Sequence, residues 1–327
     1  MENLRDEILR LNLKSIIQTK EKLKDHIIET PTIKFNSSFL KKINPNTEIF
    51  MKLELFQHTG TFKARGALSA ASQINKNKRK FGITAASAGN HAIAASYAAN
   101  KFNIKSKIFM YKSANKFRIK TVKSFTSNII FSEPNEVFKK MNYCSINEGY
   151  KIIQPFDGIY TIQGTATLGY EICNQVDNLD NIIISVGGGG LISGIGSIVK
   201  QRFPKCKIIG VEPKGASGLT KSLKAKKPLK NIKVNTIADS LGAPLHMPYS
   251  FSVCEKVIDQ MILVSDYEMK KSMRFMFDNF RLILEPACVA GIAALNGKLK
   301  NKLKNQKTLV VLCGTNIDLK SWINILN

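Results

Sequence analysis

Asn181–Gly194, NIIISVGGGGLISG, lies in the middle of a chain of 327 residues and is its most informative segment. Its first five residues, Asn181–Ser185, form an apolar run typical of a strand, and the residues after the glycines predict a helix. Consecutive glycines let the backbone approach a ligand closely and turn its N–H groups inward. Because a helix start adds partial positive charge, the stretch predicts a phosphate-binding loop at Gly187–Gly190.

Two other kinds of glycine-rich loop bind phosphate groups. A Rossmann dinucleotide site is the closer alternative, with Glu212 as the acid that would bind a ribose. Such a site is expected at the first strand-to-helix turn, whereas this loop lies deep in the chain. A P-loop is excluded because no Gly-Lys-Ser/Thr sequence closes the motif. A dinucleotide-dependent oxidoreductase is therefore an alternative that the glycine loop alone supports.

Short apolar runs alternate with longer amphipathic stretches outward from this loop. Strands are predicted at Glu48–Leu53, Phe81–Ala85, Lys107–Met110, Asn128–Phe131, Asn181–Ser185, Lys207–Val211, Met261–Val264 and Thr308–Leu312. Helices are predicted at Ser113–Phe125 and Tyr267–Phe280, and helical periodicity from Leu4 to Ile27 is predicted to end at Thr30-Pro31. The alternation indicates an α/β fold with a mainly parallel sheet, in which ligands bind at the carboxyl ends of strands.

The composition indicates a globular protein without a membrane span. Hydrophobic residues make up 44% of the chain, and no apolar run reaches the roughly 18 residues that a membrane helix needs. Met1–Arg10 lacks the apolar stretch of a secretory signal. The six cysteines form no C-x-x-C pair and the four histidines show no metal-ligand spacing, so we expect no structural zinc. Unpaired cysteines without a secretion signal fit a reducing cytoplasm.

The net charge of +25 raises the possibility of a nucleic-acid partner. The lysines are spread along the chain, and the densest runs, Lys221–Lys233 and Lys298–Lys307, contain no interleaved aromatic residues for base stacking. We therefore expect no nucleic-acid partner, while a positive field favours small anionic substrates.

Three further motifs follow predicted strands. Thr59–Ala67 places Lys63 among small residues, where it is either a surface lysine or, if desolvated near a phosphate, a neutral nucleophile. Ser87–His91, SAGNH, is either an ordinary helix start or a set of N–H groups and an amide for a ligand. Cys313–Asn316 follows the last predicted strand, where a buried cysteine at a turn is the simpler interpretation.

Together and in this order, the motifs resemble the fold-type II pyridoxal-phosphate enzymes, in particular the serine/threonine dehydratase (threonine ammonia-lyase) and serine racemase group. Thr61–Gly66 matches the family's S/T-F-K-x-R-G motif, Ser87–His91 its S-x-G-N-H loop and Gly187–Gly190 its tetraglycine loop. Lesser matches are Gln163-Gly164-Thr165, Val211-Glu212-Pro213, Thr236-Ile237-Ala238-Asp239 and Glu285-Pro286. The resemblance covers nearly the whole chain, from about Thr30 to Asp318.

The resemblance implies a tryptophan synthase β-subunit-like fold of two three-layer α/β/α domains with mainly parallel sheets. Residues 1–74 and 153–327 would form the large domain and residues 75–152 the small one, with pyridoxal 5'-phosphate in the cleft between them. Lys63 would be the Schiff-base lysine and the base for the α-proton. The other implied cofactor contacts are Phe62, Asn90, Gly187, Gly188, Gly189, Gly190, Leu191, Glu285 and Cys313. Ser87, Ala88, Gly89, Asn90 and His91 would surround the substrate carboxylate.

The implied role of several of these residues is specific. Asn90 would hydrogen-bond the ring hydroxyl and Phe62 would pack beside the ring. Cys313 would face the pyridine nitrogen, and a neutral partner there limits the electron sink, which suits elimination. Racemases of the group carry a serine as the second base, where this chain has Ala88.

A metal site of the family is also incomplete in this chain. Several members bind a divalent cation through a glutamate, a backbone carbonyl and an aspartate, and the matching positions are Glu212, Ala216 and Gly218. Because the second carboxylate is missing, we expect no metal.

The resulting hypothesis is a cytoplasmic, homodimeric dehydratase that converts a β-hydroxy amino acid to a 2-oxo acid and ammonia. Serine and threonine are the default substrates. The alternatives are a dehydratase for hydroxyaspartate or another substituted hydroxy amino acid, an amino-acid racemase, and a non-catalytic relative. An acidic substrate side chain would need a cation, for which Lys116, Arg118 and Arg281 are candidates.

Overall fold

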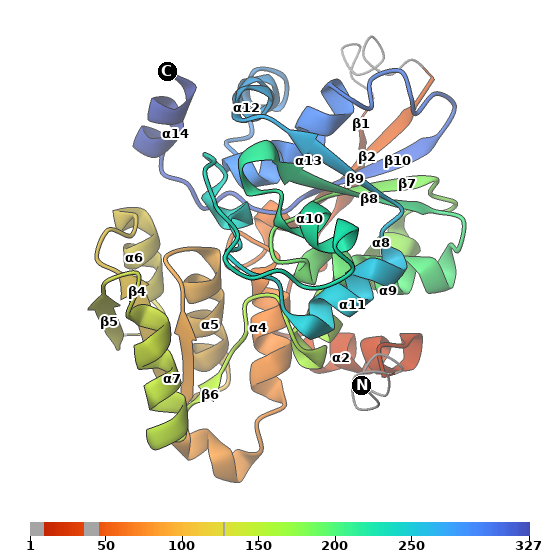
Figure 1. Ribbon diagram of the computed structural model, residues 1–327. Coiled ribbons are helices and arrows are strands. Elements are labelled where there is room, and N and C mark those ends of the chain that lie inside the picture. The colour runs from red at the N-terminus through yellow and green to blue at the C-terminus, as the bar shows by residue number, and fades with distance from the viewer. Residues whose placement is uncertain (1–9, 36–45, 127) are drawn as a thin grey trace.

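The computed structural model describes residues 10–35, 46–126 and 128–327, whose strands form two separate sheets (Figure 1). The six-stranded sheet has the order β1-β2-β10-β7-β8-β9, and the four-stranded sheet has the order β5-β4-β3-β6. The strands of the larger sheet are β1 (Thr32–Phe35), β2 (Glu48–Leu53), β7 (Asn181–Ser185), β8 (Lys207–Pro213), β9 (Gln260–Val264) and β10 (Lys307–Leu312). Those of the smaller sheet are β3 (Ile83–Ala86), β4 (Ser106–Tyr111), β5 (Ile129–Ser132) and β6 (Lys151–Ile152). Only the β1–β2 pair is antiparallel among the described pairs, which confirms the prediction of an α/β fold with mainly parallel sheets.

Helices cover both sheets. The helices around the larger sheet are α2 (Leu13–Leu23), α8 (Ile159–Gln175), α9 (Gly190–Arg202), α10 (Gly218–Lys224), α11 (Pro248–Val257), α12 (Asp266–Phe280), α13 (Pro286–Asn296) and α14 (Leu319–Leu326). Those beside the smaller sheet are α5 (Asn90–Lys101), α6 (Lys116–Lys123) and α7 (Val137–Asn147). Figure 1 shows α12 and α13 on one side of the larger sheet and α8 and α9 on the other.

Helix α4 (Lys63–Ser72) lies between the two sheets, because it packs against α8 on one side and α5 on the other. Its small apolar residues, Ala64, Ala67 and Ala71, are buried in the same core as α5. Small side chains on both helices allow the close approach. The position of α4 matters for function because its first residue is Lys63.

Eight strands were predicted from the sequence, and each lies within two residues of its predicted position. Two short strands, β1 and β6, were missed. The prediction for Phe81 was wrong, since this residue ends a 3-10 turn before Gly82, whose φ of +93° is costly for other residues.

The predicted end of the first helix was also wrong. Helix α2 starts at an Asn12–Ser15 capping box and ends at Leu23, several residues before Pro31. Leu4 and Ile8, which the prediction included, lie outside the described residues.

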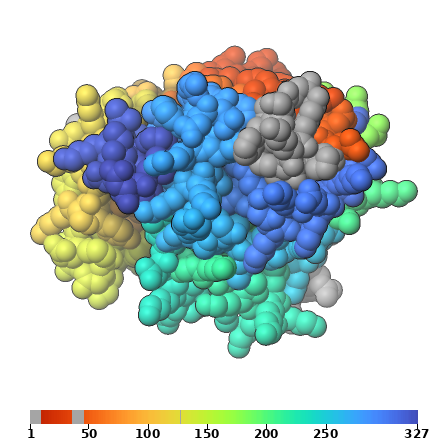
Figure 2. Space-filling view, turned by 90° about the horizontal axis from the view of Figure 1, so that it is seen from above, coloured from red at the N-terminus to blue at the C-terminus, as the bar shows by residue number. Residues whose placement is uncertain are grey.

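The C-terminal helix connects the two parts of the molecule. Figure 2 shows the C-terminal residues in dark blue against the yellow residues that surround the smaller sheet. The contact is polar: the Asn115 side chain, just before α6, donates hydrogen bonds to Asp318 (2.8 Å) and Ser321 (3.2 Å). Among the described helices, none combines the length and the apolar character needed to cross a membrane.

Candidate functional site

The tetraglycine loop connects β7 to α9 and packs tightly against Phe156. A Cβ atom on Gly188 would lie 2.3 Å from the Phe156 ring, and one on Gly190 would lie 2.7 Å from the Phe156 backbone. Gly189 has a φ of +92°, a conformation that favours glycine. Helix α9 begins at Gly190, so its free N–H groups point toward this loop. The loop therefore has the shape and polarity of an anion cradle.

Lys63 lies at the start of α4. Two backbone hydrogen bonds connect the loop before it, at Gly60 and Phe62, to the residues that follow β10. The Phe62 N–H donates to the Cys313 carbonyl (3.2 Å), and the Thr315 N–H donates to the Gly60 carbonyl (3.0 Å). The Lys63 amine donates to the Pro155 carbonyl (2.6 Å). Burial lowers the pKa of Lys63 to about 8, with a partial offset from Cys313 and Glu285. Because of this lowered pKa, part of the Lys63 amine is unprotonated near neutral pH and can act as a base or a nucleophile.

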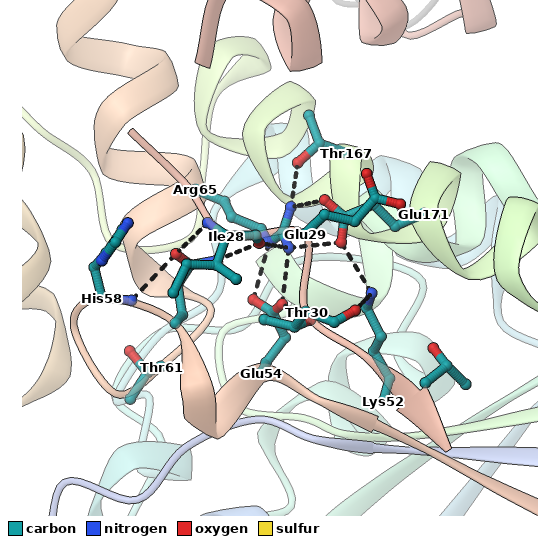
Figure 3. Close-up of polar contacts among 12 residues, drawn as sticks. Ile28, Glu29, Thr30, Lys52, Glu54, His58, Thr61, Arg65, Thr167 and Glu171 are labelled. Atoms are coloured by element: carbon teal, nitrogen blue, oxygen red, sulfur yellow. Dashed lines mark hydrogen bonds and ion pairs between the residues drawn. The ribbon is translucent and has the colours of Figure 1, made fainter. Parts of the chain in front are cut away.

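Arg65 follows Lys63 by two positions on α4. Its side chain forms the centre of a buried cluster of charges (Figure 3). Its guanidinium donates to Glu54 (2.8 and 2.9 Å) and to Glu171 (2.7 and 2.8 Å). Lys52 donates to Glu171 from the other side (2.9 Å). All four side chains are fully buried, and their formal charges sum to zero. The cluster joins α4 to β2 and α8 and so holds the start of α4, where Lys63 lies, in place.

A second polar cluster lies around Asn90. The Asn90 amide donates to Glu285 (2.8 Å) and accepts from Asn316 (2.8 Å). Arg118 pairs with Asp239, lies 3.5 Å from Glu285 and donates to the Asn316 carbonyl (3.2 Å). Burial raises the pKa of Glu285 to about 7, although Arg118 opposes this effect. The cluster therefore carries little net positive charge.

The loop before α5 is ordered by its own contacts. The Ser87 hydroxyl accepts from the Gly89 N–H (3.1 Å), and Gly89 lies beside Arg118, since a Cβ there would be 3.3 Å from the guanidinium. His91 is buried, and its Nε2 lies 2.8 Å from the Ile153 carbonyl. Burial lowers the pKa of His91 to about 3, so the ring is neutral. His91 thus has the environment of a packing residue, and Ala88 contributes only a methyl group.

One crevice brings together every residue predicted to contact the cofactor. These are Phe62, Lys63, Asn90, Gly187, Gly188, Gly189, Gly190, Leu191, Glu285 and Cys313. Ser87, Ala88, Gly89 and His91 do not line it, and His91 lines a smaller cavity that also contacts Lys63. Of the three candidate cations, only Arg118 is buried at the site. Lys116 is exposed. Arg281 is also exposed, and its guanidinium donates to the Phe277 carbonyl (3.1 Å).

Sequence reasoning missed several residues of this crevice. Phe156, Ser185, Ser240, Leu241 and Ala287 also line it. Phe156 comes from the connection between β6 and α8, residues 153–158, which matches none of the motifs found in the sequence. Ser240 and Leu241 lie directly after the Thr236–Asp239 match, so proximity to that motif could have indicated them.

Comparison with known proteins assigns the family. A family model described as pyridoxal-phosphate dependent enzyme matches residues 23–314. The chain belongs to this family. It is 38% identical to the phenylserine dehydratase of Ralstonia pickettii, with 95% of each chain aligned.

Solved structures show the same architecture. The maize serine racemase superposes with a TM-score of 0.88 at 28% identity, over 96% of each chain. The processed form of threonine deaminase isoform 2 from Solanum lycopersicum gives a TM-score of 0.88 at 30% identity, over 96% of this chain and 93% of that one. The fold-type II architecture predicted from the motifs is therefore confirmed.

The crevice fits the cofactor of this family. The loop at Gly187–Gly190 leaves no room for a Cβ on its Phe156 side and presents backbone N–H groups, as a phosphate ester requires. A lysine with a lowered pKa lies in the same crevice, as an aldehyde-binding amine requires. The Ser185 hydroxyl, buried in the wall, has no hydrogen-bond partner among the described residues.

The incomplete metal site has a different role in this chain. Glu212 accepts from the N–H groups of Leu219 (2.7 Å) and Thr220 (2.9 Å) and from the Thr220 hydroxyl (2.6 Å). Its carboxylate therefore caps the start of α10. A Cβ on Gly218 would lie 2.7 Å from Ile232 and 2.9 Å from His246, so neighbouring side chains fill the place of a second carboxylate.

We expect the Arg65→Met substitution to destabilise the protein by about 3–5 kcal/mol, because it leaves two buried carboxylates with only Lys52 as a cation. Urea unfolding of the purified protein measures this change. Lys112→Met is the matched control: it breaks the exposed Lys112–Glu133 pair, for which we expect a loss below about 1 kcal/mol. Equal losses in the two variants would contradict the importance of the cluster.

We expect chelation of divalent cations to leave the melting temperature unchanged, because three donors already occupy the Glu212 carboxylate. Thermal melting with and without EDTA, followed by addition of Mg²⁺ or Ca²⁺, tests this. A drop with EDTA that either cation reverses would show that a metal supports the fold.

Proposed function

We propose that this protein is a dehydratase that removes water from a β-hydroxy amino acid. The unsaturated product then reacts with water to give a 2-oxo acid and ammonia. The observation that carries the proposal is the position of Lys63, whose partly neutral amine shares one crevice with a phosphate-type glycine loop. The names of the relatives, phenylserine dehydratase and threonine deaminase, agree with this reaction.

In this proposal Lys63 removes the α-proton of the substrate. When bound, the cofactor supplies an electron sink for the charge left at the α-carbon. Gly187–Gly190 and the start of α9, which includes Leu191, would hold its phosphate, and Phe62 would pack beside its ring. Asn90 would hydrogen-bond the ring hydroxyl while Glu285 accepts from the Asn90 amide. A base with a pKa of about 8 is well suited to accept a proton near neutral pH.

Elimination is favoured over racemisation by two residues. Racemisation requires a second base on the opposite side of the α-carbon, and Ala88 has no titratable atom. Cys313, proposed to face the ring nitrogen, is neutral because Cys288 and burial raise the pKa of its thiol. A neutral partner does not favour protonation of that nitrogen, which limits the electron sink. The intact Lys63, Asn90 and glycine loop also argue against a non-catalytic relative.

The charge of the site favours substrates with neutral side chains. Arg118 is the cation that a dicarboxylic substrate such as hydroxyaspartate would need, but it already pairs with Asp239 and lies near Glu285. Threonine, serine and phenylserine require no such cation. The Ser87–His91 loop remains our proposal for the substrate carboxylate.

The proposal also covers the domain organisation, the cellular location and the oligomeric state of the enzyme. We infer a large domain of residues 1–74 and 153–327 and a small domain of residues 75–152, supported by the separation of the two sheets. The cofactor would bind in the cleft between them. A cytoplasmic location is supported by the six free, buried cysteines. We also propose a homodimer, as the family resemblance implies.

We expect Lys63→Ala to abolish the visible absorbance of the cofactor-loaded protein and to lower the rate of ammonia release by about 10²–10⁴-fold or more. Absorption spectra and an ammonia assay with threonine, serine and phenylserine measure the two effects. Lys139→Ala, a substitution of an exposed lysine on α7, is the matched control. Ammonia release at the native rate by Lys63→Ala would refute the assignment of Lys63 as the base that removes the α-proton.

We expect Asp239→Asn to raise the kcat/KM for hydroxyaspartate relative to threonine, because it frees the Arg118 charge. Steady-state ammonia release with both substrates gives this ratio, and Asp177→Asn at an exposed site is the control. If the native enzyme already prefers hydroxyaspartate, the neutral-substrate proposal is wrong.

A further inference from the structure

Ser185 is a buried polar residue that the mechanism above does not use. It ends β7, directly before Val186 and the tetraglycine loop, and its relative exposure is 4%. Its hydroxyl has no hydrogen-bond partner within the described ranges, and the residue lines the crevice. A buried hydroxyl without a partner costs stability, so a ligand that accepts its hydrogen bond would remove a penalty.

The alternation of side chains along β7 indicates which part of the crevice the hydroxyl faces. Ile183 points toward α13, because its Cγ2 would lie 3.3 Å from a Cβ on Gly291. Residues two apart on a strand share a face, so Ser185 also projects on the α13 side. Helix α9, which carries the phosphate loop, lies on the other side of the sheet (Figure 1). The hydroxyl therefore faces the end of the crevice away from the phosphate loop.

Ala287 and Cys313 line the crevice at this end. The parallel register pairs Val310 with Ile183, which brings the end of β10, and Cys313 after it, beside Ser185. The Cys313 thiol is already engaged, since its sulfur lies 3.9 Å from the Ala287 carbonyl. A thiol is also a weaker donor than a hydroxyl. Ser185 is thus the stronger unused donor next to Cys313.

We propose that the Ser185 hydroxyl donates a hydrogen bond to the pyridine nitrogen of the bound cofactor. This inference rests on the cofactor orientation proposed above, in which Cys313 faces that nitrogen, but not on the reaction or its substrate. A neutral hydroxyl leaves the nitrogen unprotonated, so the assignment agrees with elimination. It makes Ser185 a cofactor-binding residue in addition to those named above.

Ser69 provides a matched control. Its hydroxyl, on α4, is fully buried and also has no partner among the described residues, but Ser69 does not line the crevice. If unpaired serines in this fold are only packing residues, Ser185→Ala and Ser69→Ala will behave alike. A role in cofactor binding distinguishes them.

The test is a titration of the cofactor-free native, Ser185→Ala and Ser69→Ala proteins with pyridoxal phosphate, followed by absorbance, together with thermal melting of each cofactor-free protein. We expect Ser185→Ala to raise the apparent Kd about five- to tenfold, the usual effect of one hydrogen bond. Its cofactor-free melting temperature should not fall, because no protein contact is lost. Ser69→Ala should keep the native Kd. An unchanged Kd for Ser185→Ala, or an equal change for Ser69→Ala, would overturn the proposal.

A cofactor analogue with C–H in place of the ring nitrogen tests the contacted atom. We expect Ser185→Ala to bind this analogue as well as the native protein does. An equal loss of affinity for pyridoxal phosphate and the analogue would overturn the assignment to the nitrogen. Failure of the native protein to bind pyridoxal phosphate would instead refute the proposed function. This outcome can be told apart from the two that overturn the Ser185 proposal, because in those the native protein still binds the cofactor.

Discussion

The site depends on the buried charge cluster of Arg65, Glu54, Glu171 and Lys52. Removing four charges from water is costly unless each is paired, so the elements that carry them have one favourable arrangement. That arrangement joins β2, α4 and α8 around the Arg65 guanidinium (Figure 3). Since Lys63 lies two residues before Arg65, the cluster also sets the direction from which its amine enters the crevice.

The crevice itself is polar but nearly uncharged. Burial moves the pKa of Lys63 down to about 8 and that of Glu285 up to about 7, so both groups can exchange protons near neutral pH. Arg118 is neutralised by Asp239 and Glu285. Such opposite shifts of neighbouring groups are common where proton transfer takes place. They fit a site whose base must be neutral before it can act.

Three positions of this chain bear on its proposed chemistry. Ala88 has no titratable atom, Gly218 has no carboxylate, and the Ser185 hydroxyl in the crevice wall has no partner among the described residues. The Glu212 carboxylate binds the start of α10. We therefore expect the chain to carry out one-sided elimination without help from a metal.

The alternating fold, most strand positions, the family and many of the residues that line the crevice could be read from the sequence, because these depend on local periodicity and on ordered motifs such as Thr61–Gly66. The surroundings of those residues depend on how the chain folds. Phe156 and Ser185 join the crevice, and Arg118 meets Asp239, through contacts between segments far apart in the chain. Arg65 is present in a recognisable motif, but its partners Glu54 and Glu171 could not be read from the sequence. The desolvation that shifts the pKa of Lys63 and Glu285 likewise exists only once the chain is folded around them.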